Sequence, residues 1–422
     1  MNLCMKLAHH LHLYQPRGND IYTARINEEC YKPLSKNKVL ENVSFDIGPT
    51  LVDWLYVNDK NTLSKIIRSD KGQAMAQSYN HRLLPLARYD MDVDTQIIWG
   101  LKHFEKYFSR KPKGMWLPET ATSKRVLEKL TSHGIEYTIG ADNQNAKSSD
   151  TSKVFEIELP SKKKINYFFY NKLSGPIAHN SEMWQGSDLT YLANADYALE
   201  KIVQETKDDF ILLAYDGETF GHHHKFADMW IEHFPKSAKK KGFDTVLISS
   251  VNGEFKEKGY VWDDSAWSCK CGGLVRWTQG CDCAGAEMDY KKQLLSAAEH
   301  QEDLVHEIFD SSAGKLLVDP WDARNDYIDL SLKNLSWQEF ISKHFKNKPS
   351  RTAQGKVLDL LKAEYHTQLS FTSCGWFFEN IHPQTKNNIL DMQKAAFFIK
   401  RGVGKDISSG VKGVEWMLEH VS

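Results

Sequence analysis

Short apolar runs recur through the first 250 residues and predict the strands of a sheet. The seven runs occur at Leu7–Tyr14, Ala74–Ser78, Met115–Leu117, Ile135–Ile139, Ile165–Tyr170, Ile211–Tyr215 and Val246–Ile248. Helical patterns separate several of them, and strands that alternate with helices favour a parallel sheet with helices outside it. Seven strands suit a closed or nearly closed barrel, and a doubly wound open sheet is the alternative.

Two segments show the helical pattern clearly. In the first, apolar residues recur at i, i+4, i+7 and i+11, which are Ile97, Leu101, Phe104 and Phe108. The second runs from Ser123 to His133, with Ser123 as a candidate N-cap and Gly134 just past the end.

The pattern changes beyond about residue 285, where long segments of mixed charged and apolar residues replace the strand-like runs. These segments are Met288–Asp310, Ser336–Phe345, Thr352–Leu369 and Ile389–Arg401. They predict a helical domain packed on the barrel. We therefore expect an α/β fold with a seven-stranded (β/α) barrel over residues 1–255. A Cys- and Gly-rich loop follows over 256–286, and a helical C-terminal domain over 287–422.

The composition is that of a globular protein without a dominant charge. The 422 residues include 54 Lys and Arg against 55 Asp and Glu, which gives a formal net charge of -1. No basic field therefore points to nucleic acid or an anionic membrane as a partner. Aromatic residues make up 12%, with 12 Trp. This content fits a protein that stacks the flat faces of sugars, although Trp is also a common core residue.

The N-terminal sequence is strand-like and interrupted by histidines, unlike a secretory signal peptide. The longest clean apolar run, Phe210–Tyr215, is far shorter than the roughly 20 residues that span a bilayer. An odd count of 7 cysteines disfavours a secreted disulfide framework. We expect a soluble, cytoplasmic protein, and the sequence leaves its oligomeric state open.

Active sites of α/β barrels lie at the C-terminal ends of the strands, so the residues that end each run are informative. The first run places His10 and His12 on one face and is followed by Gln15. A single histidine there would suit a core, whereas two followed by Gln suggest a polar pocket. The third run ends at Pro118, which leaves Glu119 at the rim with Trp116 nearby.

The sixth run, Ile211–Tyr215, is entirely apolar together with Phe210 before it, and it stops at Asp216, with Glu218 and His222 shortly after it. Asp216 could simply cap a helix. Two acids at the ends of two strands are, however, what glycoside cleavage requires. One carboxyl protonates the leaving oxygen, and the other attacks the anomeric carbon or activates water. The residues alone do not choose between Asp216 and Glu218 for the second acid.

These motifs resemble glycoside hydrolase family 57, whose members act on α-glucans with retention through a seven-stranded barrel and a helical C-terminal region. His10-x-His12-x-x-Gln15-Pro16 resembles the first motif of the family. Trp116-Leu-Pro-Glu119 resembles the nucleophile motif, and Tyr215-Asp216-Gly-Glu218-Thr-Phe-Gly-His222 resembles the acid/base motif. The resemblance implies Glu119 as nucleophile and Asp216, rather than Glu218, as general acid/base.

The resemblance extends to residues that bind the substrate. Ser78-Tyr-Asn-His81 resembles a family segment whose His reaches the sugar, and Trp376 matches the fifth motif. The chain is most similar to members that carry a C-terminal domain of unknown function. The likeness there lies in the Trp267-Ser-Cys269 loop and in Thr372–Phe378. We expect His10, His12, His81, Trp116 and His222 to line one cavity with the two acids.

Four cysteines form two short pairs, Cys269-x-Cys271 and Cys281-x-Cys283, with nine residues between the pairs. Four thiolates in one loop can hold Zn²⁺ in a tetrahedron, and such a zinc would be structural. Free thiols and disulfides are the alternatives. The same loop carries Arg276 and Trp277, which we expect to touch substrate. No cofactor is expected to be required for catalysis.

The sequence thus predicts a retaining glycoside hydrolase that acts on α-glucans in the manner of an α-amylase. A transglycosylase, either a 4-α-glucanotransferase or a branching enzyme, is an alternative. A non-catalytic glycan-binding relative is another, although both acids are present. A metal-dependent deacetylase on a related barrel would need an acid on the first strand, and none stands beside His10 and His12.

Overall fold

The computed structural model describes residues 5–179, 188–205, 210–269, 271, 273–284, 286–287 and 289–419. The chain forms two compact units. The barrel unit consists of Met1–Gln77 and Tyr107–Trp267, and the helical unit of Ser78–Lys106 and Ser268–Ser422. Among the described residues, no helix is long and apolar enough to cross a membrane.

Two parallel arrays of strands build the wall of the barrel unit. The first has the order β4 (Met115–Trp116), β3 (Ala74–Gln77), β2 (Ser44–Ile47), β1 (Met5–Leu13) and β8 (Phe210–Asp216). The second pairs β5 (Tyr137–Ala141) in parallel with β7 (Lys164–Tyr170). The arrays meet on both sides: Gly114 bridges Tyr137 in parallel, and the Asn171 N–H donates to the Leu212 carbonyl over 2.7 Å. The described residues therefore supply seven barrel strands, which confirms the predicted fold class.

Six of the predicted strands overlap β1, β3, β4, β5, β7 and β8. The seventh prediction was wrong, because Ile248 begins the helix α10 (Ile248–Val251) and the strand there, β9, spans Phe243–Thr245. β9 pairs with the start of β1, and Val246 adds one further hydrogen bond to Leu7. Among the seven strands of the barrel wall, the one that the sequence did not predict is β2. Outside the barrel wall, β6 (Val154–Glu158) pairs antiparallel with β7, and β10 (Lys256–Gly259) pairs with β6.

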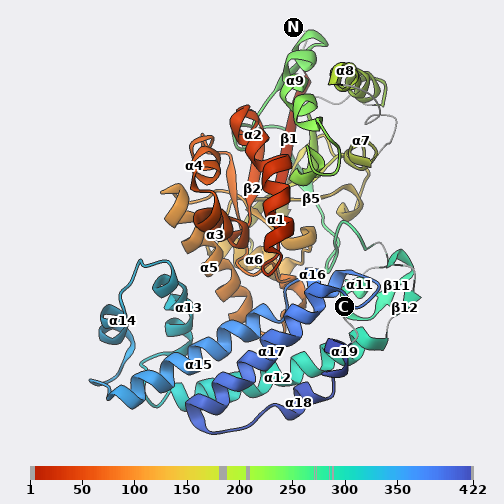
Figure 1. Cartoon of the computed structure of the whole chain (residues 1–422). Coiled ribbons are helices and arrows are strands. Elements are labelled where there is room, and N and C mark those ends of the chain that lie inside the picture. The colour runs from red at the N-terminus through yellow and green to blue at the C-terminus, as the bar shows by residue number, and fades with distance from the viewer. Residues whose placement is uncertain are drawn as a thin grey trace. The chain divides into compact units, whose positions relative to one another are not determined.

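Helices connect the strands of the barrel unit (Figure 1). They are α1 (Asp20–Ile26), α2 (Lys32–Lys36), α3 (Pro49–Asn58), α4 (Lys60–Arg68), α6 (Lys124–Ser132), α7 (Ser174–His179), α8 (Asp188–Glu205) and α9 (Ala227–Lys240). The start of α6 is capped as predicted, since the Ser123 side chain accepts from the Val126 N–H. Gly134, just past its end, has a φ of 84°, a conformation that favours glycine.

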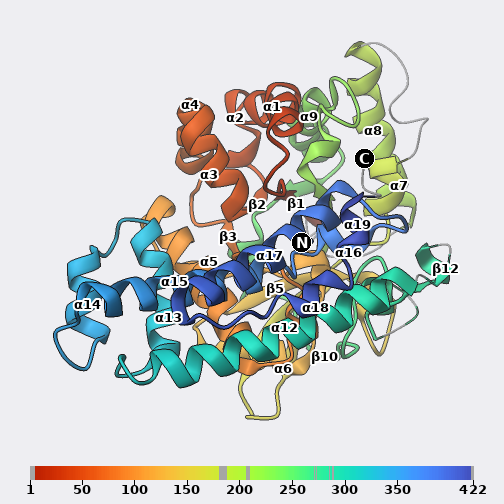
Figure 2. The same ribbon diagram turned by 60° about the horizontal axis from the view of Figure 1, so that its bottom comes forward.

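The helical unit confirms the predicted helical C-terminal region. Its elements are α11 (Val275–Thr278), β11 (Gly280–Cys281), β12 (Ala286–Glu287), α12 (Asp289–Ala313), α13 (Pro320–Ser331), α14 (Trp337–His344), α15 (Arg351–Leu369), α16 (Cys374–Phe377), α17 (Pro383–Val403), α18 (Ser409–Lys412) and α19 (Trp416–Glu419). Most of α5 (Asp90–Phe108) belongs to it as well. α12, α15 and α17 lie side by side (Figures 1 and 2), and their apolar faces bury Phe309, Leu360 and Ile399.

A buried ionic network joins four helices of this unit. Asp92 on α5 accepts hydrogen bonds from Arg324 on α13 (2.7 Å) and from Nε2 of His306 on α12 (3.0 Å). Nδ1 of the same histidine donates to Glu364 on α15 (2.9 Å). Burial would lower the pKa of His306, but the charges of Glu364 and Asp92 raise it to about 10. His306 is therefore an imidazolium with both N–H groups engaged, so it has no lone pair to offer a metal ion.

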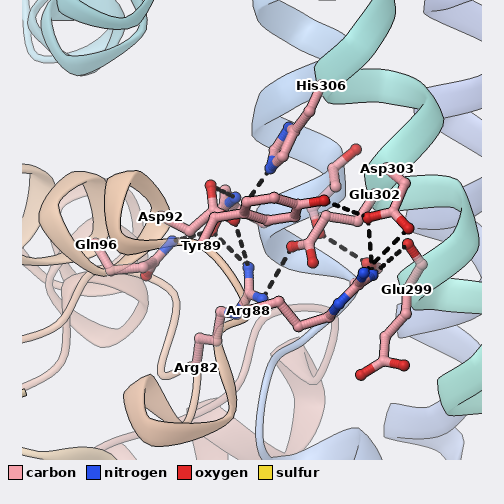
Figure 3. A network of polar contacts seen from close by, with 12 residues as sticks. Arg82, Arg88, Tyr89, Asp92, Gln96, Glu299, Glu302, Asp303 and His306 are labelled. Atoms are coloured by element: carbon pink, nitrogen blue, oxygen red, sulfur yellow. Dashed lines mark hydrogen bonds and ion pairs between the residues drawn. The ribbon is translucent and has the colours of Figure 1, made fainter. Parts of the chain in front are cut away.

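Arg82 adds a third cation to the network and pairs with Asp92 and Glu302. Figure 3 shows Arg82 turned toward Asp92 and Glu302, and its Nη2 lies 2.9 Å from the Glu302 carboxylate. Arg82, Asp92 and Glu302 are all buried. A buried ion pair repays the cost of removing its charges from water only when each charge keeps its partners. The network therefore fixes the relative placement of these helices.

Replacing Asp92 with Asn removes the charge at the centre of this network without changing its shape. We expect the free energy of unfolding to fall by about 3–5 kcal/mol, because Arg324 and His306 would each lose one of their buried carboxylate partners. Thermal and denaturant unfolding would measure the loss. Asp303→Asn is the control: Asp303 pairs with Arg88 at the surface, with side-chain exposures of 40% and 37%, and should cost under about 1 kcal/mol. Equal losses would contradict the assigned role of Asp92.

Candidate active site

Polar and aromatic residues stand side by side where neighbouring barrel strands end. His12 on β1 is in register with Asp216 on β8 and with Asp46 on β2. On the next pair of strands, Gln77 of β3 is in register with Trp116 of β4. Because these strands are parallel, their C-terminal ends meet at one edge, which is where barrel enzymes place their active sites.

A single carboxylate connects the two histidines of β1. Nε2 of His10 donates to Oδ1 of Asp46 over 2.8 Å, and Nδ1 of His12 donates to Oδ2 over 2.9 Å. Gln77 donates to the same Asp46 side chain. His10 and Asp46 are completely buried. These hydrogen bonds orient both imidazole rings and determine which nitrogen of each carries a proton toward Asp46.

Trp116 packs against both histidines. Its ring lies 5.0 Å from that of His10 at an interplanar angle of 9°, and 4.8 Å from that of His12 at 20°. Trp116 is itself buried. The structure therefore brings His10, His12 and Trp116 into one stacked group with Asp46 at its base.

The two histidines differ in charge. Burial would lower the pKa of His12, but the negative charge of Asp46, with Asp216 and Glu218 further away, raises it to about 9. In His10, burial prevails over Asp46 and lowers the pKa. His12 is therefore a cation at neutral pH, whereas His10 is neutral. The dependence on Asp216 and Glu218 also places both acids within electrostatic range of His12.

Glu119 occupies a strained turn directly after β4. Its φ is 58°, and that of the next residue, Thr120, is 51°. Residues other than glycine adopt such angles at a cost of about 1–3 kcal/mol, and they concentrate at functional sites. The indole N–H of Trp267 donates to Oε2 of Glu119 over 2.9 Å, and the Thr120 hydroxyl donates to Gln144 over 2.8 Å. Both contacts hold the turn in place.

Asp216 is the exposed last residue of β8. Tyr170, at the end of β7, is influenced by the charges of both Asp216 and Glu119. Burial raises the pKa of Tyr170, and the charges of Asp142, Asp216 and Glu119 raise it further. Asp216 and Glu119 therefore both lie within electrostatic range of one phenol at the barrel edge.

Glu218 has a different environment from Asp216. It is buried, and its Oε1 accepts from Nε2 of Gln15 over 3.1 Å and from the Tyr31 hydroxyl. Burial, together with the nearby charge of Asp216, raises the pKa of Glu218 to about 7. Gln15 thus contacts the second acid of the motif, and Glu218 is held inward while Asp216 faces solvent.

The family profile of glycosyl hydrolase family 57 matches residues 4–262, and that of a domain of unknown function, DUF3536, matches residues 289–411. The chain belongs to glycosyl hydrolase family 57. This confirms the resemblance seen in the motifs. The second match covers most of the helical unit.

Two curated relatives are similar to part of this family 57 chain. Alpha-amylase 1 of Dictyoglomus thermophilum is 26% identical over 258 residues, which is 57% of this chain and 36% of the relative. An alpha-amylase of Pyrococcus abyssi is 24% identical over 276 residues, 60% of this chain and 39% of the relative. The chain therefore spans less than half the length of the curated relatives it matches.

Solved structures resemble nearly the whole chain. An exo-type maltose-forming amylase from Pyrococcus sp. ST04 has a TM-score of 0.74 at 15% identity, covering 98% of this chain and 82% of that one. A family 57-type branching enzyme from Pyrococcus horikoshii has a TM-score of 0.69 at 16% identity, covering 98% and 94%. At these identities the likeness concerns the fold.

His222 lies in the barrel unit of this family 57 protein, where it contacts Glu29 and Tyr22. Its Nδ1 is 2.6 Å from Glu29, and its Nε2 is 2.8 Å from the Tyr22 hydroxyl. The next residue, His223, is close enough to Asp216 for that charge to act against the burial that lowers its pKa. Sequence reasoning singled out His222 and did not single out His223.

The other predicted substrate residues belong to the helical unit. Nδ1 of His81 is 2.7 Å from the Ser373 hydroxyl, and the indole of Trp376 donates to the Ser370 carbonyl over 3.2 Å. Both residues are buried there.

Arg276 and Trp277 are also buried in that unit. The Arg276 guanidinium pairs with Glu379 at 3.0 Å and lies 3.9 Å from the centre of the Phe377 ring. The ring of Trp277 lies 6.0 Å from that of Phe377. Each of these side chains thus has packing partners within the helical unit.

Asp46→Asn removes the negative charge that raises the pKa of His12. The stabilisation that His12 provides is complete below its unfolded pKa of 6.5 and is lost as the pH rises through about 9. We expect the variant to lose about 2–3 kcal/mol of stability near pH 7 and less above pH 9. Unfolding curves at both pH values would measure the difference.

The exposed Asp53 on α3 offers the control, since Asp53→Asn should leave stability unchanged at either pH. An NMR titration of His12 provides a second readout, in which its pKa should fall below the ordinary value in Asp46→Asn. A loss that is the same at both pH values would contradict this account of the Asp46–His12 pair.

Proposed function

We propose that this family 57 protein acts on α-glucans by double displacement, as a retaining glycoside hydrolase or transglycosylase. One observation carries the proposal: Glu119 comes shortly after β4 and Asp216 ends β8, two strands of the parallel barrel that also holds the His10–Asp46–His12 group. Its likeness to proteins named as alpha-amylases and branching enzymes supports the α-glucan substrate. Whether water or an acceptor sugar resolves the glycosyl-enzyme decides between hydrolysis and transfer.

We assign Glu119 as the nucleophile. A carboxylate that attacks the anomeric carbon must be ionised and must keep one oxygen directed at the sugar. The Trp267 indole donates to Oε2 of Glu119, which stabilises the ionised form. The strained backbone at Glu119 fixes the direction of the side chain, because a turn with two positive φ values has few alternatives.

We assign Asp216 as the acid/base. It protonates the glycosidic oxygen in the first step, and it takes a proton from water or from an acceptor hydroxyl in the second. Its position at the exposed end of β8 suits a group that must meet a substrate oxygen. Glu218 instead accepts two hydrogen bonds in the protein interior, so we assign it a positioning role behind Asp216.

The cationic His12 completes the electrostatics of the site. Its positive charge is paired with the buried carboxylate of Asp46, within electrostatic range of Asp216 and Glu218. His12 is itself buried, with its ring stacked on that of Trp116. The reaction as proposed needs no metal ion or cofactor.

The first test is incubation of the full chain with a panel of linear and branched α-glucans, with wild type beside Glu119→Gln. We expect wild-type turnover and a loss of several orders of magnitude in the variant, because no covalent intermediate can form. Proton NMR of the first product should show the α-anomer, as retention requires. Glu257→Gln, at an exposed position of β10, should behave as wild type. Glucan binding without turnover by the wild type would instead establish a non-catalytic relative.

A second test separates the roles of Asp216 and Glu218. Asp216→Ala should lose most activity on glucans and least on aryl glycosides, whose activated leaving groups need little protonation. Glu218→Ala should lose activity to the same degree on both substrates, since it acts through position. The ratio of kcat/KM for the two substrate classes measures the difference. If Glu218→Ala shows the leaving-group dependence and Asp216→Ala does not, the assignment is reversed.

A further inference from the structure

Four cysteine sulfurs converge on one point in the helical unit. The Sγ atoms of Cys269, Cys271, Cys281 and Cys283 all lie within 4.8 Å of one another. Within this group, the Sγ atoms of Cys269 and Cys281 are 3.9 Å apart, and those of Cys271 and Cys283 are 3.3 Å apart. None of the four forms a disulfide. Each short pair of the sequence thus contributes one residue to each of the close contacts.

The local backbone explains how residues so far apart in the loop come together. Gly273 and Leu274 have φ values of 62° and 55° and turn the chain before α11. Gly280, with a φ of 80°, leads it into β11, which pairs antiparallel with β12. Between these two short strands, a 3₁₀ turn over Asp282–Ala284 carries Cys283. The chain therefore folds back so that the second pair of cysteines faces the first.

We propose that these four cysteines bind one Zn²⁺ ion in a closed, tetrahedral site. A tetrahedron with Zn–S bonds of about 2.3 Å has sulfurs about 3.8 Å apart, and the distances of 3.3 and 3.9 Å lie on either side of this value. Two disulfides would need only pairwise contact, at about 2.05 Å. They would give no reason for the pairs Cys269/Cys281 and Cys271/Cys283 to share one centre.

The surroundings of the cluster suit a metal–thiolate group. Thiolates are the ligands that favour Zn²⁺ over Mg²⁺ or Ca²⁺, and four of them leave a net charge of about -2 on the bound group. Lys291 on α12 is buried and lies close enough to Cys281 for their charges to interact. Its ammonium donates to the Arg276 carbonyl over 2.9 Å. A positive charge is therefore fixed beside the cluster.

The exposure of the four residues indicates how an ion enters and what it does there. Cys271 and Cys283 are exposed, which provides an entry path, whereas Cys269 and Cys281 are buried. With four protein ligands no coordination position remains for water or substrate, so the ion stabilises the loop and does not join the reaction. Removal of the metal should lower thermal stability without abolishing activity in the short term.

Elemental analysis of the purified full chain tests the proposal independently of its activity on glucans. We expect about one zinc per chain, and less than about 0.2 in protein never exposed to chelator would overturn the proposal. Thiol titration of the denatured protein without reductant should then find all 7 cysteines reactive. Four thiols that appear only after reduction would instead establish two disulfides.

Two variants locate the metal. Cys281→Ser should lose the zinc, while Cys374→Ser, which removes a thiol elsewhere in the same unit, should retain it. Equal zinc content in both variants would overturn the assignment. If Cys281→Ser does not fold, stepwise modification of the wild-type thiols in the presence of a chromogenic zinc indicator replaces it. Zinc should then be released as the cluster thiols react, and release only after Cys30 or Cys374 is modified would contradict the site.

Discussion

The buried carboxylate of Asp46 is the constraint on which the barrel edge depends. A lone carboxylate in the interior would be far too costly, and it persists because His10, His12 and Gln77 all donate to it. In return it fixes the orientation of both imidazoles and holds them against Trp116. The polar floor of the site is therefore built from strand residues of the core, which are more rigid than loops.

The two acids after β8 illustrate how one short motif provides two environments. Glu218 is enclosed and accepts from Gln15 and Tyr31, and burial raises its pKa to about 7. Asp216, two residues earlier, is exposed at the strand end. When neighbouring carboxyl groups differ in this way, they are suited to different roles. The division of labour proposed between them follows from the direction in which each side chain leaves the same turn.

Sequence patterns revealed strands whose residues are uniformly apolar and failed where function interrupts the pattern. The run Phe210–Tyr215 predicted β8, and Asp216 directly after it stood out. β2 was missed because Ser44 and Asp46 occupy two of its four positions, and the partners that neutralise Asp46 come from β1, more than thirty residues away. The sequence also did not distinguish exposed from buried tryptophans. Trp267 is 42% exposed and donates to Glu119, whereas Trp277 is 1% exposed.

The same arrangement of a central aspartate appears in both units with different consequences. Asp92 accepts from Arg324, His306 and Gln368, as Asp46 accepts from two histidines and a glutamine. In the helical unit, the other ring nitrogen of His306 donates to a second buried carboxylate, Glu364, so this histidine lies between two opposite charges. At the barrel edge, by contrast, the charge of His12 interacts with Asp216, which is exposed, as well as with the buried Asp46 and Glu218. The electrostatic field of His12 therefore extends to the surface where a substrate would bind.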